Sequence, residues 1–182
     1  MSGPAPGVLD RLSLASAQQR VLRAGVLGAS LLLLVLPVAA GGSLTWFFTV
    51  PALVLAVLAA LLPESNIPLA LVLWLGVFWL RSMPDRVDAW TLVAAVDLAV
   101  LHVACTAASY GPPGLVLDRG LLSRWARRLL LCSVAAALTW AASEVIAFLD
   151  LPPSRLALAL ALVAVLGWAG LIGVRLARAD AD

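Results

Sequence analysis

The chain has 182 residues, of which 63% are hydrophobic and 12% are charged, and its mean hydropathy is +1.06. Ordinary soluble domains are about 45–50% apolar and about 25% charged. A water-soluble fold of this size leaves too much of its area exposed to hide so many apolar side chains. The composition therefore excludes a soluble domain and predicts an all-α integral membrane helical bundle. The net charge of +2 favours no class of partner, and we expect no nucleic-acid ligand.

The first residues, 1–23, are polar and basic and are expected to form a cytoplasmic tail. Met1 to Gly7 is rich in Gly and Pro, a composition typical of a disordered end. Asp10 to Arg23 contains apolar and basic residues in a pattern that favours a short helix on the membrane surface.

An uncharged run extends from Ala24 to Pro63. It is too long for one transmembrane helix of about 17–25 residues, and its length suits two. Gly41-Gly42-Ser43 predicts a tight turn that divides the run. The first two spans are therefore expected at about 24–40 and 44–62.

The remaining sequence predicts four further spans, an inner loop and a charged cytoplasmic tail. The spans lie at about 67–80, 89–109, 129–149 and 156–174, the inner loop at 110–128 and the tail at 175–182. The span at 67–80 is the shortest, and whether it crosses the whole membrane is left open. Pro68 suits the first turn of its helix, where a missing backbone N–H costs little.

The distribution of arginine predicts the orientation of these six spans. Nine arginines fall on one side if both termini are cytoplasmic: Arg11, Arg20, Arg23, Arg119, Arg124, Arg127, Arg128, Arg175 and Arg178. Three fall on the other side: Arg81, Arg86 and Arg155. Positive residues accumulate on the cytoplasmic side of membrane proteins. Omitting the span at 67–80 would give six against six, so the asymmetry favours keeping it.

Asp97 is the sharpest chemical feature of the sequence, because it lies within the apolar span 89–109. A carboxylate near the middle of a bilayer costs roughly 2.5–3.5 kcal/mol on insertion scales. We therefore expect Asp97 to face other helices or a watery cavity. It could serve as a proton or cation site, or as a structural carboxyl that is hydrogen-bonded to a neighbouring helix.

Glu144 and His102 complete the candidate intramembrane polar site. Glu144 in the fifth span has a depth similar to that of Asp97, so the two carboxyls could share a proton if their helices touch. Glu144 could equally extend toward the membrane interface. His102 is five residues after Asp97, about 140° around a helix, and is not expected on the same face.

Catalytic and metal sites are not predicted. His102 and Cys105 are adjacent on one helix face, but no CxxC or HExxH motif and no second histidine accompany them. Neither the cysteines nor any other motif indicates a cofactor.

The inner loop 110–128 combines apolar and basic side chains. Tyr110-Gly-Pro-Pro-Gly should end the preceding helix. From Asp118 to Arg128 the pattern predicts a short interfacial helix, with Trp125 dipping into the membrane. Its candidate lipid or partner contacts are Arg119, Arg124, Trp125, Arg127 and Arg128. The loop could alternatively act only as a topology anchor.

The stretch from Leu101-His102-Val103-Ala104-Cys105 to Tyr110-Gly111-Pro112-Pro113 resembles small actinobacterial multi-spanning membrane proteins found near MoxR-type ATPase loci. The resemblance covers roughly residues 85–130. It implies an accessory or envelope-associated role and supplies no catalytic residues.

The sequence therefore predicts a noncatalytic multi-pass protein of a bacterial cytoplasmic membrane. Its expected role is that of an accessory or scaffolding subunit of a membrane complex. Its expected partners are the lipid bilayer, other membrane subunits or a cytoplasmic protein at the loop 110–128. The alternative is a small proton- or ion-coupled transporter that uses Asp97, with Glu144 as its candidate partner.

Overall fold

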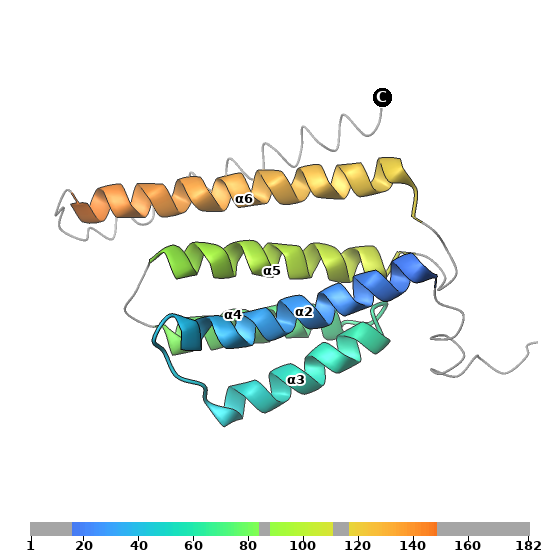
Figure 1. Cartoon of the computed structure of the whole chain (residues 1–182), viewed down its shortest axis with the longest axis horizontal. Helices are drawn as coiled ribbons and strands as arrows, with labels where there is room; N and C mark the ends of the chain where they lie inside the picture. The colour runs from blue at the N-terminus through green and yellow to red at the C-terminus, as the bar shows by residue number, and fades with distance from the viewer. Residues whose placement is uncertain (1–15, 84–87, 111–116, 149–182) are drawn as a thin grey trace, which may run out of the picture. The chain divides into compact units, whose positions relative to one another are not determined.

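The computed structural model describes residues 16–83, 88–110 and 117–148. Within these ranges the chain forms five α-helices and no strand (Figure 1). The helices are α2 (Ala17–Ala39), α3 (Trp46–Leu61), α4 (Ile67–Ser82), α5 (Ala89–Ala108) and α6 (Arg119–Phe148). The all-helical prediction is thus confirmed for the described residues. The expected span at 156–174 and the tail at 175–182 lie outside them.

Three of these helices are long and apolar enough to cross a membrane: α2, α5 and the Arg119–Val145 portion of α6. The other two, α3 and α4, are apolar but have only 16 residues each. At about 1.5 Å per residue, a 16-residue helix reaches roughly 24 Å, short of a hydrocarbon core of about 30 Å. The helices indicate a membrane protein, and they leave the crossing of α3 and α4 open.

The predicted turn at Gly41-Gly42-Ser43 is present between α2 and α3. Gly41 has a φ of 82°, in the left-handed region that glycine tolerates. The backbone N–H of Gly42 donates to the carbonyl of Pro37 at 2.7 Å. This bond satisfies one of the carbonyls that a helix leaves free at its end.

Two helices begin earlier than the sequence pattern suggested. Residues 17–23 of the expected surface helix and the span 24–40 form one helix, α2, whereas residues 10–15 lie outside the described part of the chain. In the same way, the expected interfacial helix at 118–128 continues without a break into the next span as α6. Neither junction contains a proline, and Gly25 after Arg23 is tolerated inside a helix, so the hydrogen-bond ladder continues from basic into apolar sequence.

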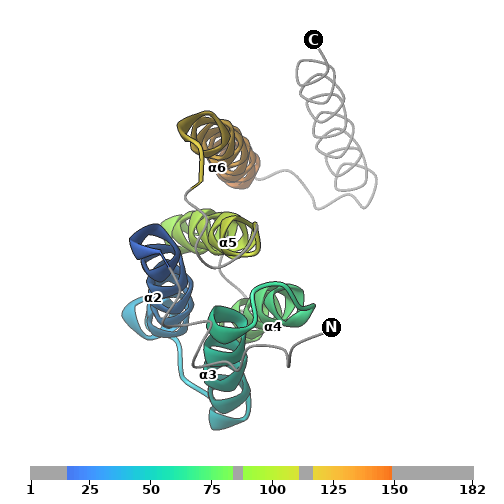
Figure 2. The ribbon, with the colours of Figure 1, turned by 90° about the vertical axis from the view of Figure 1, so that its right-hand side faces the viewer.

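The first of two compact units, residues 1–137, contains α2 to α5; the second comprises residues 138–182. Successive helices from α2 to α5 run in opposite directions (Figure 1). Each of them contacts the other three, and the most extensive contacts follow the ring order α2–α3–α4–α5, as the end-on view in Figure 2 shows.

The core between these four helices combines small and large side chains. Ala52, Ala56 and Ala59 form the buried stripe of α3, and this stripe allows the neighbouring backbones to come close. α4 contributes the large side chains Leu71, Leu75 and Phe78 to the same core. α2 and α5 contribute Val26, Ala29, Leu33, Ala94, Leu101 and Cys105.

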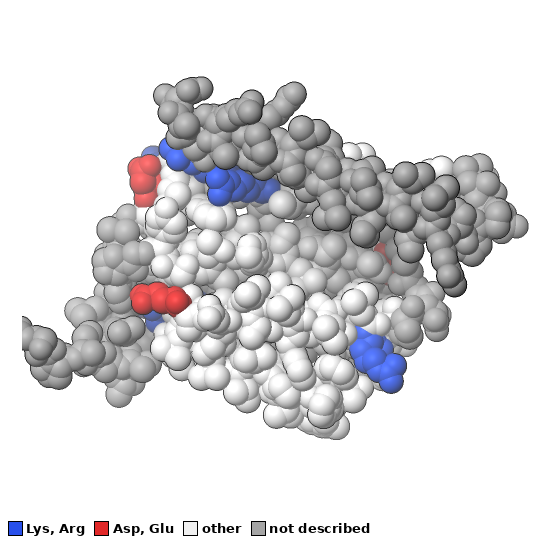
Figure 3. All heavy atoms as spheres, turned by 180° about the vertical axis from the view of Figure 1, so that it is seen from behind, with Lys and Arg blue, Asp and Glu red and all other residues white. Residues whose placement is uncertain are grey.

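The outward faces of these helices are also apolar. Large hydrophobic side chains that are at least half exposed include Leu31, Val35, Val54, Val57, Leu69, Leu73, Val77 and Leu80. The lower described part of Figure 3 is a broad uncharged surface, with charged side chains only at its left and right edges. An exposed apolar area of this extent is typical of contact with lipid.

Candidate functional site

Asp97 lies in the middle of the buried stripe of α5. The stripe contains Ala94, Asp97, Leu101, Cys105 and Ala108, which recur every three or four residues on one helix face. Asp97 is only 8% exposed. This burial agrees with the expectation that the carboxyl faces the bundle, where it avoids hydrocarbon that offers no hydrogen bond.

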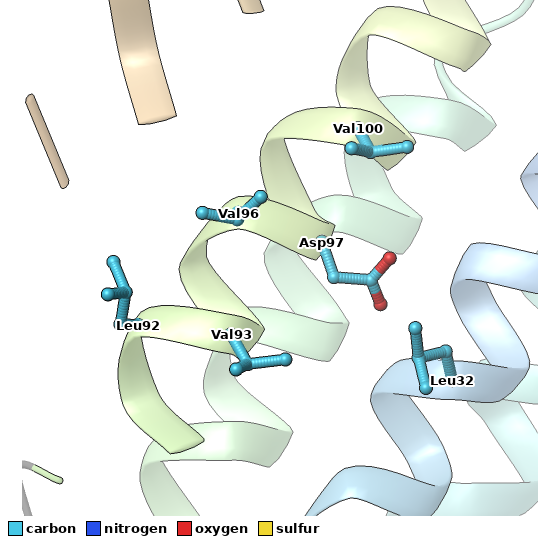
Figure 4. Close-up of a pocket in the computed structure, with 6 residues that line it drawn as sticks. All are labelled: Leu32, Leu92, Val93, Val96, Asp97 and Val100. Carbon is cyan, nitrogen blue, oxygen red and sulfur yellow. The ribbon is translucent and has the colours of Figure 1, made fainter. Parts of the chain in front are cut away.

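The carboxyl of Asp97 opens onto a hollow of about 320 Å³ between α5 and α2. The other residues that line this Asp97 hollow are apolar: Leu32, Leu92, Val93, Val96 and Val100. In Figure 4 the carboxyl points from α5 toward α2, with Leu32 across from it. Leu32, Val93 and Val100 are 46%, 43% and 36% exposed, so the hollow opens on the surface of the bundle.

One oxygen of this carboxyl, Oδ2, is buried and has no hydrogen-bond partner in the described part of the chain. Buried polar atoms almost always have a partner, because leaving one unpaired costs about 1–3 kcal/mol. The Asp97 hollow therefore combines an apolar wall with one unmet hydrogen-bonding group. Such a site can accept a hydrogen bond as a carboxylate, or hold a proton as a neutral acid.

His102 does not join Asp97. Its side chain is exposed, whereas Asp97 and Cys105 are buried. Its backbone carbonyl accepts a hydrogen bond from Oγ1 of Thr106 at 2.8 Å. Among the residues that the structure describes, no group of three or more His, Cys, Asp and Glu side chains is arranged to hold a metal ion.

Glu144 is exposed near the end of α6 and belongs to the second compact unit. Its pairing with Asp97, which belongs to the first unit, therefore remains a prediction. Cys132 on α6 is exposed, and both cysteines are free thiols.

The basic side chains predicted to contact lipid or a partner lie in the first three turns of α6. Arg119, Arg124 and Arg127 are exposed. The guanidinium of Arg128 lies 5.1 Å from the centre of the Trp125 ring. This cation–π contact joins residues three positions apart and holds the two side chains together on one face of the helix.

Two polar residues at the beginning of α2 were not predicted as functional. Gln19 is only 1% exposed, and its side-chain Oε1 and Nε2 have no partner among the described residues. The same is true of the buried Nε and Nη1 atoms of Arg23. Residues 19, 23, 26 and 30 recur at helical spacing. This spacing predicts that Gln19 and Arg23 share a helix face with Val26 and Ser30, provided that residues 17–23 belong to the same helix as the apolar run.

Comparison with known proteins finds no matching family model, no similar curated protein and no similar solved structure.

Proposed function

We propose that this protein is a noncatalytic integral membrane subunit that scaffolds or stabilises a larger membrane or envelope-associated complex. The observation that supports the proposal is the Asp97 hollow, where a buried carboxyl oxygen lacks a hydrogen-bond donor on the surface of the bundle. Lipid tails cannot supply that donor. A transmembrane helix of another subunit can supply one from Ser, Thr, Asn or Trp while its apolar side chains fill the hollow.

The proposed setting is a bacterial cytoplasmic membrane, with six spans and both termini in the cytoplasm. The arginine asymmetry supports this orientation, because positive loops are retained inside. The alternating directions of α2 to α5 are compatible with it, since they place the beginning of α2 and the end of α5 at the same end of the bundle. The resemblance to membrane proteins near MoxR-type ATPase loci supports the accessory role.

The assembly state of Asp97 variants in native membranes tests the scaffold. In mild detergent, we expect the wild-type chain to migrate in a complex larger than its own oligomer. Asp97→Leu should release it, because leucine cannot accept a hydrogen bond, whereas Asp97→Asn should retain it. Val100→Leu, which alters the apolar wall of the hollow and leaves the carboxyl in place, is the control. Migration of the wild type and Asp97→Leu at the same size would contradict the scaffold.

A second candidate function, proton- or ion-coupled transport, is favoured by the same carboxyl, because a group in an apolar hollow can release and regain a proton. Here Asp97→Asn is decisive, since an amide cannot titrate. In proteoliposomes with a pH-sensitive dye, transport predicts that the wild type dissipates an imposed pH gradient and that Asp97→Asn does not. Glu144→Gln tests the proposed partner carboxyl. Equal dye traces for the wild type, both variants and empty vesicles would reject transport and leave the scaffold unaffected.

A further inference from the structure

Gln19 and Arg23 form a second polar site, about one helical turn long, where α2 begins. They are four residues apart and so lie next to each other on the same face of the helix. Gln19 is almost fully buried, and Arg23 is half-buried with its Nε and Nη1 atoms turned inside. None of these four nitrogen and oxygen atoms has a hydrogen-bond partner among the described residues.

The surrounding contacts fix this end of the helix without satisfying the two side chains. Ser16 caps α2 by accepting the backbone N–H of Gln19 at 3.2 Å. The Oε1 atom of Gln18 accepts the backbone N–H of Leu117 at 2.9 Å, which ties the segment before α6 to α2. Both bonds use other groups and leave the Gln19 side-chain amide and the Nε and Nη1 atoms of Arg23 without a partner among the described residues.

No described carboxylate compensates the charge of Arg23. Asp97 is the buried acid of the bundle, and Leu32 lies beside it across the hollow. Arg23 is nine residues before Leu32, which is roughly 13 Å along the helix axis at about 1.5 Å per residue. A cation left unpaired in a poorly hydrated place is costly, so such a group calls for an anion with several acceptor atoms.

We propose that Gln19 and Arg23 bind the phosphate group of an anionic membrane lipid. A guanidinium and a carboxamide together offer N–H donors that match phosphate oxygens. Because these four atoms are buried, the side chains that cover them must move aside when the headgroup enters, and Gln19 Oε1 can then accept a hydrogen bond from it. The position along the chain favours a lipid, because Arg23 is the last charged residue before the uncharged run from Ala24 to Pro63. It therefore lies where the hydrocarbon core meets the headgroups.

Lipid-dependent thermal unfolding of the purified full-length protein in detergent tests the proposal. The probes are phosphatidylglycerol, the zwitterionic phosphatidylcholine and inorganic phosphate, and native mass spectrometry measures the lipid that stays bound. Arg23→Gln removes the cation, and Gln19→Leu removes the amide at similar volume. Arg20→Gln is the matched control, because Arg20 is exposed on the same helix and carries the same charge.

We expect phosphatidylglycerol to raise the unfolding temperature of the wild type and of Arg20→Gln by the same amount. Arg23→Gln should weaken lipid binding by roughly tenfold or more, as expected for the loss of hydrogen bonds to a charged group. Gln19→Leu should weaken lipid binding. Without lipid, its unfolding temperature should equal or exceed that of the wild type, because the substitution removes buried unpaired atoms. A purely structural glutamine would instead lose stability in both conditions.

Three results would overturn the proposal. Undiminished phosphatidylglycerol binding by both Arg23→Gln and Gln19→Leu would exclude the site. An equal loss in Arg20→Gln would reduce the effect to diffuse attraction between positive residues and the lipid surface. The same stabilisation by inorganic phosphate as by phosphatidylglycerol would assign the site to free phosphate and not to a lipid.

Discussion

At the scale of single residues, the turn between α2 and α3 depends on the absence of a side chain. A Cβ atom at Gly42 would lie 3.0 Å from the carbonyl oxygen of Pro37 and 3.1 Å from both Sδ of Met83 and the carbonyl oxygen of Ser82. Two of these neighbours are backbone atoms, which cannot rotate away. Gly42 thus lets the end of α2 approach the end of α4 closely.

Gly42→Ala is therefore expected to lower the free energy of unfolding in detergent by about 1–3 kcal/mol, the range typical of an overpacked site. Gly28→Ala is the control, because a Cβ atom there meets nothing within 4 Å. In a helix interior, alanine is more favourable than glycine by up to about 1 kcal/mol, so this variant should be equally or more stable. Denaturant titration followed by circular dichroism measures both, and a Gly42→Ala variant as stable as Gly28→Ala would contradict the packing argument.

At the scale of the helices, α5 has a well-defined beginning. Oδ1 of Asp88 accepts the backbone N–H groups of Trp90 and Thr91 at 3.0 and 3.3 Å. These are two of the four N–H groups that a helix leaves unpaired at its first turn. The cap lies directly before the predicted span 89–109, and it sets the start of the helix that carries Asp97.

Removing this cap by Asp88→Ala should cost about 0.5–2 kcal/mol of stability, whereas Asp88→Asn should cost little because asparagine caps helices about as well as aspartate. Thermal unfolding of the two variants in the same detergent distinguishes the cap from a simple loss of charge. If both substitutions lower stability equally, the negative charge and not the hydrogen-bonded cap stabilises α5.

The length of α6 changes the interpretation of the basic loop. At about 1.5 Å per residue, its 30 residues extend roughly 45 Å, which exceeds the hydrocarbon core by about 15 Å. A straight helix of this length must tilt or extend its first turns beyond the core. We therefore expect Arg119 to Arg128 at the headgroup level as the end of a span, which differs from the separate surface helix predicted from sequence.

At the scale of the whole molecule, orientation in the membrane is the main prediction. The turn at Gly42 is expected outside, and residues 120 and 182 inside. Single cysteines test this in a background that carries Cys105→Ala and Cys132→Ala. Because a side chain at Gly42 would clash, the labels are placed at Ser43→Cys, Ser123→Cys and Asp182→Cys.

In intact cells, a membrane-impermeant maleimide should modify the cysteine at Ser43 and should reach the other two only after permeabilisation. The physical reason is that arginine-rich segments stay in the cytoplasm during insertion. Modification at Ser123 in intact cells would show that the orientation is the opposite of the predicted one. If Asp182 and Ser123 lay on different sides of the membrane, an even number of crossings after α5 would be refuted.

Local patterns in the sequence determined the helices and most of their ends. An uncharged run of known length must form helices in a bilayer, since each backbone group then finds its partner within the segment. Gly41-Gly42, Pro68 and Asp88 act through neighbouring residues, so the ends that they set were also predictable. A change from basic to apolar sequence predicts a boundary at Arg23 and at Arg128, but α2 and α6 continue through these positions because no proline interrupts them.

Only the tertiary structure decided which face of each helix is buried. In a membrane protein the outward faces are as apolar as the inward ones, so hydrophobic periodicity carries little information about packing. The inward orientation of Asp97 was predictable because lipid tails offer a carboxyl no hydrogen-bond partner. The Asp97 hollow, and the burial of Gln19 beside Arg23, depend on how α2 and its neighbours pack. That packing joins residues far apart in the chain, which no local pattern specifies.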